Sequence, residues 1–244
     1  MNNTLLPAIL FSLCCIVSII IFLRGLRLVL ARTPWDKKRQ SRVFQRTLIF
    51  LTVWILLLGA LSLGGFFADF SRLPPRLPLA LLIPLLVVLR VVSTKGGQEL
   101  LKHVPPQWII YLQTFRIVVE IVLWLGVLRG LLPVQMSLEG RNFDILSGLL
   151  AIPVGYYCFV KMTWPAWVVL LYNIAGLLLL LNVVAIAVLS MPTPFRVFHN
   201  EPANTLVVQF PFIFLPGVLV PLAYTLHIFS LRQWAMARRA RRLG

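Results

Sequence analysis

Three side chains suited to proton or ion chemistry lie inside one long apolar stretch of the sequence. Gln113, Arg116 and Glu120 are three and four residues apart, so a helix places all three on one face. An ionisable side chain inside a membrane is costly unless it faces protein or water and finds a partner. The spacing therefore predicts an Arg116–Glu120 pair, which is either a proton or substrate site or a neutral pair that locks helix packing.

Further polar side chains lie in the inner halves of the two last apolar stretches. Asn173 is typical of hydrogen bonding between helices, whereas His227 either has a functional role or bonds a carbonyl near the membrane surface. Pro211, Pro216 and Pro221 each remove a backbone hydrogen bond, so the freed carbonyls need partners or water. We expect one intramembrane polar site whose members are Gln113, Arg116, Glu120, Asn173, Tyr224 and His227.

A second polar group occupies two short loops between apolar stretches. Asp144 directly precedes one stretch and Asn204 precedes another, so each is placed to cap a helix. The two loops contain more polar side chains than capping requires, which favours a polar cluster at the outer membrane surface. The expected members are Glu139, Arg141, Asn142, Asp144, Arg196, His199, Glu201 and Asn204.

The apolar stretches themselves predict an all-α, polytopic membrane helix bundle. Of the 244 residues, 59% are hydrophobic and 12% are charged, whereas a soluble protein is about a quarter charged. A membrane helix needs about 20 apolar residues. Seven transmembrane helices are expected, at about 5–23, 47–67, 77–92, 108–132, 145–160, 166–190 and 207–231. The third and fifth are short and contain Pro84 and Pro153, so each is either a full span or a broken segment.

The basic residues indicate how these helices cross the membrane. If the N-terminus lies outside, 16 of the 23 Lys and Arg residues fall in inside segments and four in outside loops. This asymmetry is what the positive-inside rule predicts for seven spans. We therefore expect the N-terminus outside, the C-terminus in the cytoplasm with a basic tail at 233–244, and one transmembrane domain over 1–244. The first stretch follows no basic residues and precedes no cleavage site, which predicts an anchor rather than a signal peptide.

Sequence patterns of several membrane functions are missing. The last stretch has no lysine for a retinal Schiff base, and the sequence has no HExxH, GxSxG or P-loop. Cys14, Cys15 and Cys158 form no CxxC, so we expect neither a metal nor a cofactor. The basic first loop and tail favour anionic lipids over nucleic acid. The expected partners are the lipid bilayer and a second copy or another membrane subunit.

Residues 100–235 resemble a family of uncharacterised bacterial integral membrane proteins. The residues that carry the resemblance are Gln113–Arg116 with Glu120, Pro133–Asp144, Pro194–Arg196 and Asn200–Thr205. The run Glu-Gly-Arg-Asn-Phe-Asp at 139–144 is the most specific part, and position 137 is Ser where the family pattern has Thr. The resemblance implies residence in the bacterial inner membrane and implies no activity.

Three functions fit these expectations. The leading hypothesis is a small transporter or a proton- or ion-coupled permease with the Arg116–Glu120 pair at its centre. The alternative is a non-catalytic membrane subunit that partners or regulates another complex. The third is a membrane enzyme that acts on lipid-linked substrates through Glu139, Asp144 and Glu201, although an enzyme is the less favoured class. A water-filled cavity at Glu120 would indicate transport, and a dry bundle would indicate the subunit.

Overall fold

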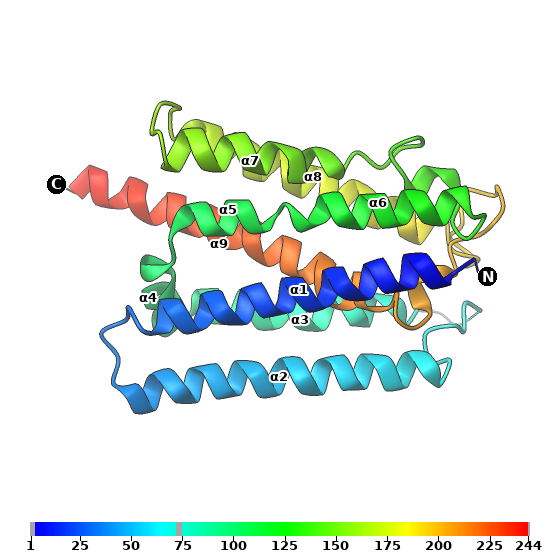
Figure 1. The fold of residues 1–244 in the computed structure, drawn as a ribbon, viewed down its shortest axis with the longest axis horizontal. Helices are drawn as coiled ribbons and strands as arrows, with labels where there is room; N and C mark the ends of the chain where they lie inside the picture. Colours follow the sequence, from blue (N-terminus) through cyan, green and yellow to red (C-terminus); the bar gives the residue numbers. More distant parts are fainter. Residues whose placement is uncertain (1–2, 72–74, 244) are drawn as a thin grey trace.

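Long helices run side by side along one axis in the computed structural model (Figure 1). The structure describes residues 3–71 and 75–243, with side chains as far as Arg239, and these residues form helices and no strand. The α-helices are α1 (Leu5–Leu30), α2 (Lys37–Leu63), α3 (Leu77–Ser93), α4 (Lys95–His103), α5 (Pro106–Leu112), α6 (Phe115–Leu128), α7 (Ile145–Phe159), α8 (Trp167–Leu189) and α9 (Val220–Leu243). Short segments η1 (Val134–Met136), η2 (Leu206–Val208) and the π-helical η3 (Leu215–Leu219) complete the set.

The lengths of these helices identify a multi-pass membrane protein. Within the described residues, five segments are long and apolar enough to cross a membrane, namely α1, α2, Pro106–Leu128, α8 and Leu215–Arg239. The number rises to six if α3 and α4, which meet at a bend of 85°, form one broken span. The apolar helix α7 has 15 residues and is shorter than a standard span. The count of seven spans therefore stays a prediction.

The two ends of the bundle differ in the segments that they contain. The α1–α2 connection, α4, the α7–α8 connection and the C-terminal end of α9 lie at one end (Figure 1). The start of α1 and the segments that connect α6 with α7 and α8 with α9 lie at the other end. The basic first loop and the basic tail thus share an end, which the positive-inside prediction requires. Which end faces the cytoplasm remains a prediction.

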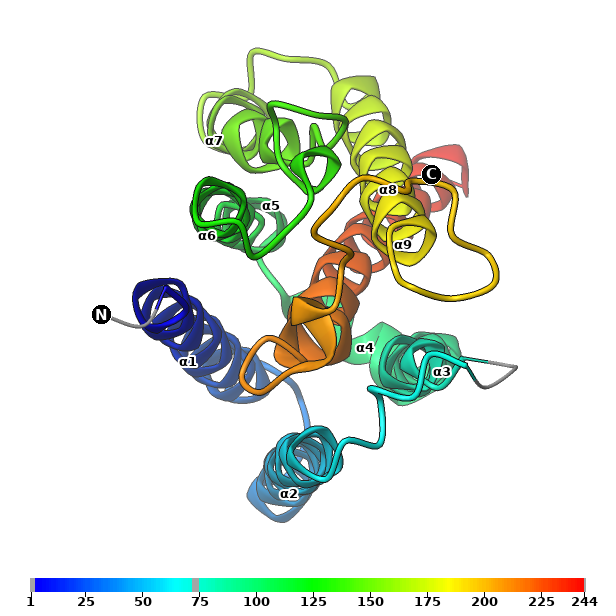
Figure 2. The ribbon, with the colours of Figure 1, turned by 90° about the vertical axis from the view of Figure 1, so that its right-hand side faces the viewer.

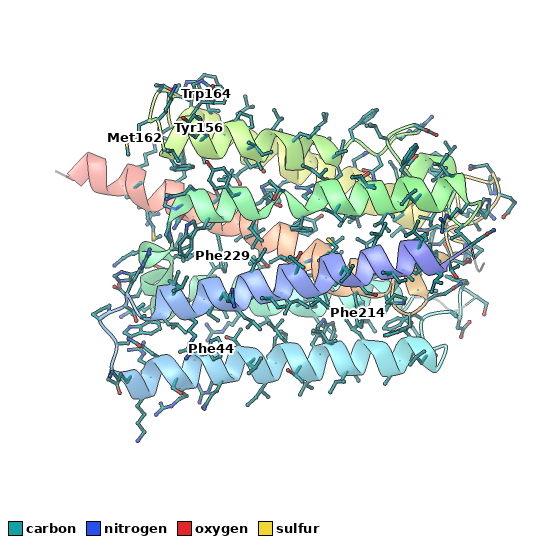
Figure 3. All side chains as sticks on the ribbon, in the orientation of Figure 1. Phe44, Tyr156, Met162, Trp164, Phe214 and Phe229 are labelled. Carbon is teal, nitrogen blue, oxygen red and sulfur yellow. The ribbon has the colours of Figure 1, made fainter. Side chains whose placement is uncertain are left out.

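Aromatic side chains mark the end of the bundle at the α7–α8 connection. Tyr156, Met162 and Trp164 lie together there (Figure 3). The rings of Tyr157 and Trp164 stack with centroids 4.8 Å apart, and the Lys161 ammonium lies 5.9 Å from the Tyr157 ring. Aromatic and basic side chains of this kind are typical of a membrane–water interface.

The η3 segment and the start of α9 lie at the centre of the bundle, with the other long helices around them (Figure 2). Helix α9 packs against α3, α5 and α8, and η3 precedes it in the same span. The apolar core includes Phe11, Leu58, Ile213 and Leu219, all fully buried. By contrast, α1 and α2 expose large apolar side chains on their outer faces, as helices in contact with lipid do.

The last membrane helix begins later than the sequence predicts. Residues 207–213 form no α-helix, and the span starts with the π-helical segment at Leu215. The proline-rich sequence leaves carbonyls free, and α2 supplies partners for them. Trp54 Nε1 donates to the Gly217 carbonyl at 2.8 Å, and Ser62 Oγ donates to the Val208 carbonyl at 2.7 Å. The polar side chains of α2 thus hold an irregular segment inside the bundle.

Candidate functional site

The segment between α6 and α7 turns back into the bundle. Helix α7 starts beside the junction of α5 and α6 (Figure 1), where a Cβ at Gly148 would lie 3.1 Å from the Ile117 amide nitrogen. Asn142 is 0% exposed and Asp144 is 5% exposed. Irregular backbone occurs at this depth only where protein buries it or a cavity adjoins it. The sequence-based assignment of Asn142 and Asp144 to the outer surface is therefore wrong, because the short α7 starts inside the bundle.

The helix that carries Arg116 is interrupted just before this residue. Helix α5 ends at Leu112 and α6 begins at Phe115. The amides of Gln113, Thr114, Arg116 and Ile117 bond to carbonyls three residues earlier, at 3.0–3.1 Å, which tightens the turn. Discontinuous helices of this kind form the substrate and ion sites of many transporters.

Arg116 is buried and forms its ion pair with Asp144. Its Nε donates to Asp144 Oδ2 at 2.7 Å and its Nη2 donates to Oδ1, so the contact is bidentate. The Arg116–Glu120 pair that the spacing predicts is therefore wrong. An Arg that precedes Glu by one turn is the weaker order for such a pair, and the segment before α7 brings a second carboxylate into reach.

Glu120 has a separate partner. Asn142 Nδ2 lies 2.8 Å from Glu120 Oε1, 2.9 Å from Oε2 and 3.0 Å from the Met136 carbonyl. The Asn142 Oδ1 accepts from the Asp144 amide at 3.1 Å. One asparagine therefore connects the two buried acidic residues.

His227 continues the polar network towards the other end of the bundle. Arg116 Nη1 lies 2.9 Å from His227 Nε2, and His227 Nδ1 lies 2.9 Å from Asn173 Oδ1. Asn173 Nδ2 donates to Ser230 Oγ at 2.8 Å. Because a guanidinium only donates, Nε2 must accept, which leaves the proton of a neutral imidazole on Nδ1. Hydrogen-bond donation then runs in one direction, from Arg116 to His227, Asn173 and Ser230.

Two polar atoms beside this network lack a hydrogen-bond partner in the described part of the chain. They are Gln113 Oε1 and Ser147 Oγ, and both residues are 1% exposed. Gln113 Nε2 donates to the Ala223 carbonyl at 3.3 Å, so only the acceptor end of the amide is open. An open buried polar atom is costly unless water or a ligand satisfies it. Tyr224, the remaining expected member of the site, is half-buried and packs against the apolar core.

The loop that connects α6 with α7 lies against the loop that connects α8 with α9. Gln135 Nε2 donates to Ser190 Oγ at 2.9 Å, and Asn200 Nδ2 donates to Gln135 Oε1 at 2.8 Å. The Arg141 guanidinium lies 5.4 Å from the centre of the Phe198 ring. The loops thus meet through Gln135 and Ser190, which the sequence interpretation did not select, and through Arg141, which it did.

The acidic residues of these loops have separate partners. Trp124 Nε1 donates to Glu139 at 2.7 Å. Arg196 Nη2 and the Ala203 amide both donate to Glu201, at 3.0 and 2.8 Å. The bond from Arg196, followed by the bond from the amide, holds the pKa of Glu201 below its ordinary value.

His199 and Asn204 do not join these acidic residues either. His199 is exposed at the surface of its loop. Asn204 is buried and donates to the Ala187 carbonyl near the end of α8, at 2.9 Å, rather than capping the following helix. The eight polar residues expected in one outer cluster are therefore divided among the surface, the buried network and, for Asn204, a separate buried contact with α8.

A cavity of about 170 Å³ adjoins the buried network. It lies between α3, α6, α8 and the η3–α9 segment, and its walls are almost wholly apolar. Arg116, Glu120 and Asp144 form part of the wall, but their polar atoms are engaged with each other and with Asn142. The described residues contain no group of three or more His, Cys, Asp or Glu that could hold a metal.

The helices and this network define a multi-pass helical membrane protein with charged groups inside its bundle. Residues 74–235 match the family described as "Domain of unknown function (DUF8737)", and the chain belongs to this family. The matched region contains the whole network from Gln113 to Ser230, whereas α1 and α2 precede it. No curated protein and no solved structure matches the chain. The resemblance to an uncharacterised family is thus confirmed, while a bacterial origin and seven spans stay predictions.

Proposed function

We propose that this protein is a small proton-coupled permease of the bacterial inner membrane. The observation that carries the proposal is the hydrogen-bonded chain from Asp144 through Arg116, His227 and Asn173 to Ser230. Ionisable groups inside membrane bundles are costly, and they mark proton relays and substrate paths in pumps and transporters. The chain lies between two irregular helices, α5–α6 and η3–α9, which is also typical of transporter sites.

Two carboxylates within reach of one arginine provide a mechanism for coupling. Arg116 pairs with Asp144, while Glu120 lies one turn further along the same helix and bonds Asn142. Protonation of Asp144 would remove the negative charge that holds Arg116. Glu120 would then be the remaining carboxylate on the face of α6 that carries Arg116. Exchange of Arg116 between the two acids is a two-state element that proton binding can shift.

A role as a non-catalytic subunit is the second candidate, and the surface of α2 favours it. Only 17% of the most apolar 18-residue stretch of α2 is buried inside the protein. On this helix, Leu56 and Leu63 are 66% and 74% exposed. Such a face contacts either lipid or another membrane protein. The enzyme hypothesis gains no such support, because Glu139, Asp144 and Glu201 have separate partners.

Access from both membrane faces distinguishes the permease from the subunit. We would replace Ser147 by Cys in a chain whose three native cysteines are Ala, and apply a membrane-impermeant thiol reagent to each side of oriented vesicles. Ser147 adjoins the network, and its hydroxyl has no hydrogen-bond partner among the described residues. A permease would expose this position to the solution on each side of the membrane in turn. Ser18→Cys on α1 is the matched control, because Ser18 is also buried (2% exposed). Labelling of Ser147→Cys from neither side would contradict the permease.

A further inference from the structure

The apolar cavity reaches the side of the bundle. Its lining includes Leu82 of α3, which is 47% exposed, and the half-buried Val184 and Val188 of α8. Helices α3 and α8 stand on two sides of the central η3–α9 segment (Figure 2). The cavity therefore reaches the outer surface between these two helices.

The surface around this opening is apolar. Ile83 follows Leu82 on α3 and is 41% exposed, and Leu181 lies one turn before Val184 on α8 and is 58% exposed. These residues lie in the second turn of α3 and in the second half of α8, within two apolar helices. Hydrocarbon surrounds such helices in a membrane, so we expect lipid chains rather than water at the opening.

The interior of the cavity selects against water. Leu123, Leu180 and Leu219 line it from three different helical segments, and the polar atoms of Arg116, Glu120 and Asp144 already have partners. An engineered cavity of about 150 Å³ with Leu, Ile and Phe walls, in another protein, stays dry and binds benzene. A cavity of about 170 Å³ whose walls are almost wholly apolar is large enough for an apolar guest.

We propose that this cavity binds one acyl chain of a membrane phospholipid, which enters between α3 and α8. An empty cavity forfeits the dispersion contacts of its lining atoms, and a hydrocarbon chain restores these contacts without loss of any hydrogen bond. The bound chain would lie against the carbon atoms of the Arg116 and Glu120 side chains. This inference does not depend on whether the polar network moves protons.

A phosphatidylcholine with a photoreactive diazirine in the middle of one acyl chain tests the proposal. The full-length protein is placed in vesicles that contain this lipid, irradiated and digested, and the labelled residues are mapped by mass spectrometry. We expect labels at Leu180 and Leu219, which are 2% and 1% exposed and line the cavity. Leu181, on the outer face of α8, reports ordinary contact with bulk lipid.

Two alanines on α8 provide matched variants. Ala187 lines the cavity, whereas Ala185 is exposed on the outer face of the same helix. We expect Ala187→Trp to lower labelling of Leu180 and Leu219 about tenfold relative to Leu181, because the larger side chain fills the cavity. Ala185→Trp should leave this ratio unchanged.

Labelling of Leu181 without Leu180 or Leu219 in the unmodified protein would overturn the proposal. This outcome needs no variant, so it holds even if Ala187→Trp does not fold. Equal loss of interior labelling in both tryptophan variants would also overturn it. The two-sided access of Ser147→Cys is measured separately, so the acyl-chain site and the permease can fail independently.

Discussion

The Arg116 guanidinium and the Asp144 carboxylate form a buried bidentate ion pair although 28 positions separate them in the chain. One residue comes from the first turn of α6 and the other from the position before α7. Both exposed fractions are 5% or less, so neither charge has water as an alternative partner. This pair fixes the segment between α6 and α7 inside the bundle.

Removal of one member of this pair should destabilise the protein strongly. We expect Asp144→Asn to lower the free energy of unfolding by about 3–5 kcal/mol, because it removes the carboxylate that forms the bidentate pair with the buried Arg116 charge. Glu120→Gln should cost less, since an amide oxygen still accepts from Asn142. Thermal unfolding in detergent compares the variants.

Two further variants control this comparison. Glu99→Gln should have little effect, because Glu99 is a partly exposed residue of α4 that pairs with Lys102. The double variant Arg116→Gln with Asp144→Asn should recover much of the stability if the cost comes from the unpaired charge. A larger loss for Glu120→Gln than for Asp144→Asn would show that Glu120 is the main partner of Arg116.

The bond from Arg116 also determines the tautomer of His227. We expect the proton on Nδ1, with Nε2 as the acceptor, because Arg116 has only donors to offer. Nitrogen-15 chemical shifts of labelled histidine in the membrane-embedded protein distinguish the two tautomers. The exposed His199 provides a reference signal within the same chain. A proton on His227 Nε2 would be incompatible with the direction of donation described above.

Close approach of α8 and α9 at this histidine depends on Gly176. A Cβ at this position would overlap the His227 ring, since Cε1 is its nearest neighbour and Nε2 lies 2.6 Å away. We expect Gly176→Ala to cost about 1–3 kcal/mol of unfolding free energy through overpacking. Gly25→Ala on α1 is the matched control, because nothing lies within 4 Å of its added Cβ. That variant should gain about 0.5–1 kcal/mol from helix propensity. Equal effects would refute the steric explanation.

The sequence predicted the helical class because apolar length and helical spacing are local properties. Gln113, Arg116, Glu120, Asn173 and His227 are buried near one another or near a shared partner, and their role as one functional site stays a prediction. Which acidic residue pairs with Arg116 is not a local property of the sequence. The depth at which α7 begins decides whether Asp144 meets Arg116.

The residues that the sequence interpretation missed are small or uncharged. Ser230 lies three residues after His227, so helical spacing offered a signal for it. Gln135 and Ser190 join two loops across 55 positions. The spacing of residues gives no information about a contact of this kind, because it depends on how the loops fold over the end of the bundle.

Acid should loosen the loop that contains Glu201. Its pKa lies below the ordinary value because Arg196 and the Ala203 amide bond the ionised carboxylate. A group with a lowered pKa stabilises the folded loop above its ordinary pKa, and this contribution is lost as the pH falls through the lowered value. We expect hydrogen exchange of the Ala203 amide, corrected for its intrinsic pH dependence, to become less protected over that acidic range. In Glu201→Gln the protection should not change with pH; a persisting pH dependence would exclude Glu201 as the cause.

The sidedness of the bundle can be tested at two exposed positions near its opposite ends. Ser41 follows the basic first loop, and His199 lies in the loop between α8 and α9. The positive-inside asymmetry predicts that Ser41→Cys reacts with an impermeant reagent only from the cytoplasm, and His199→Cys only from outside. Both positions are exposed, so a failure to react reflects the side of the membrane rather than burial. Ser137 would be a poor choice, since it is 0% exposed.

Reaction of both variants from the same side would contradict the odd number of spans. Reaction from opposite sides in reversed order would keep that number and invert the protein in the membrane.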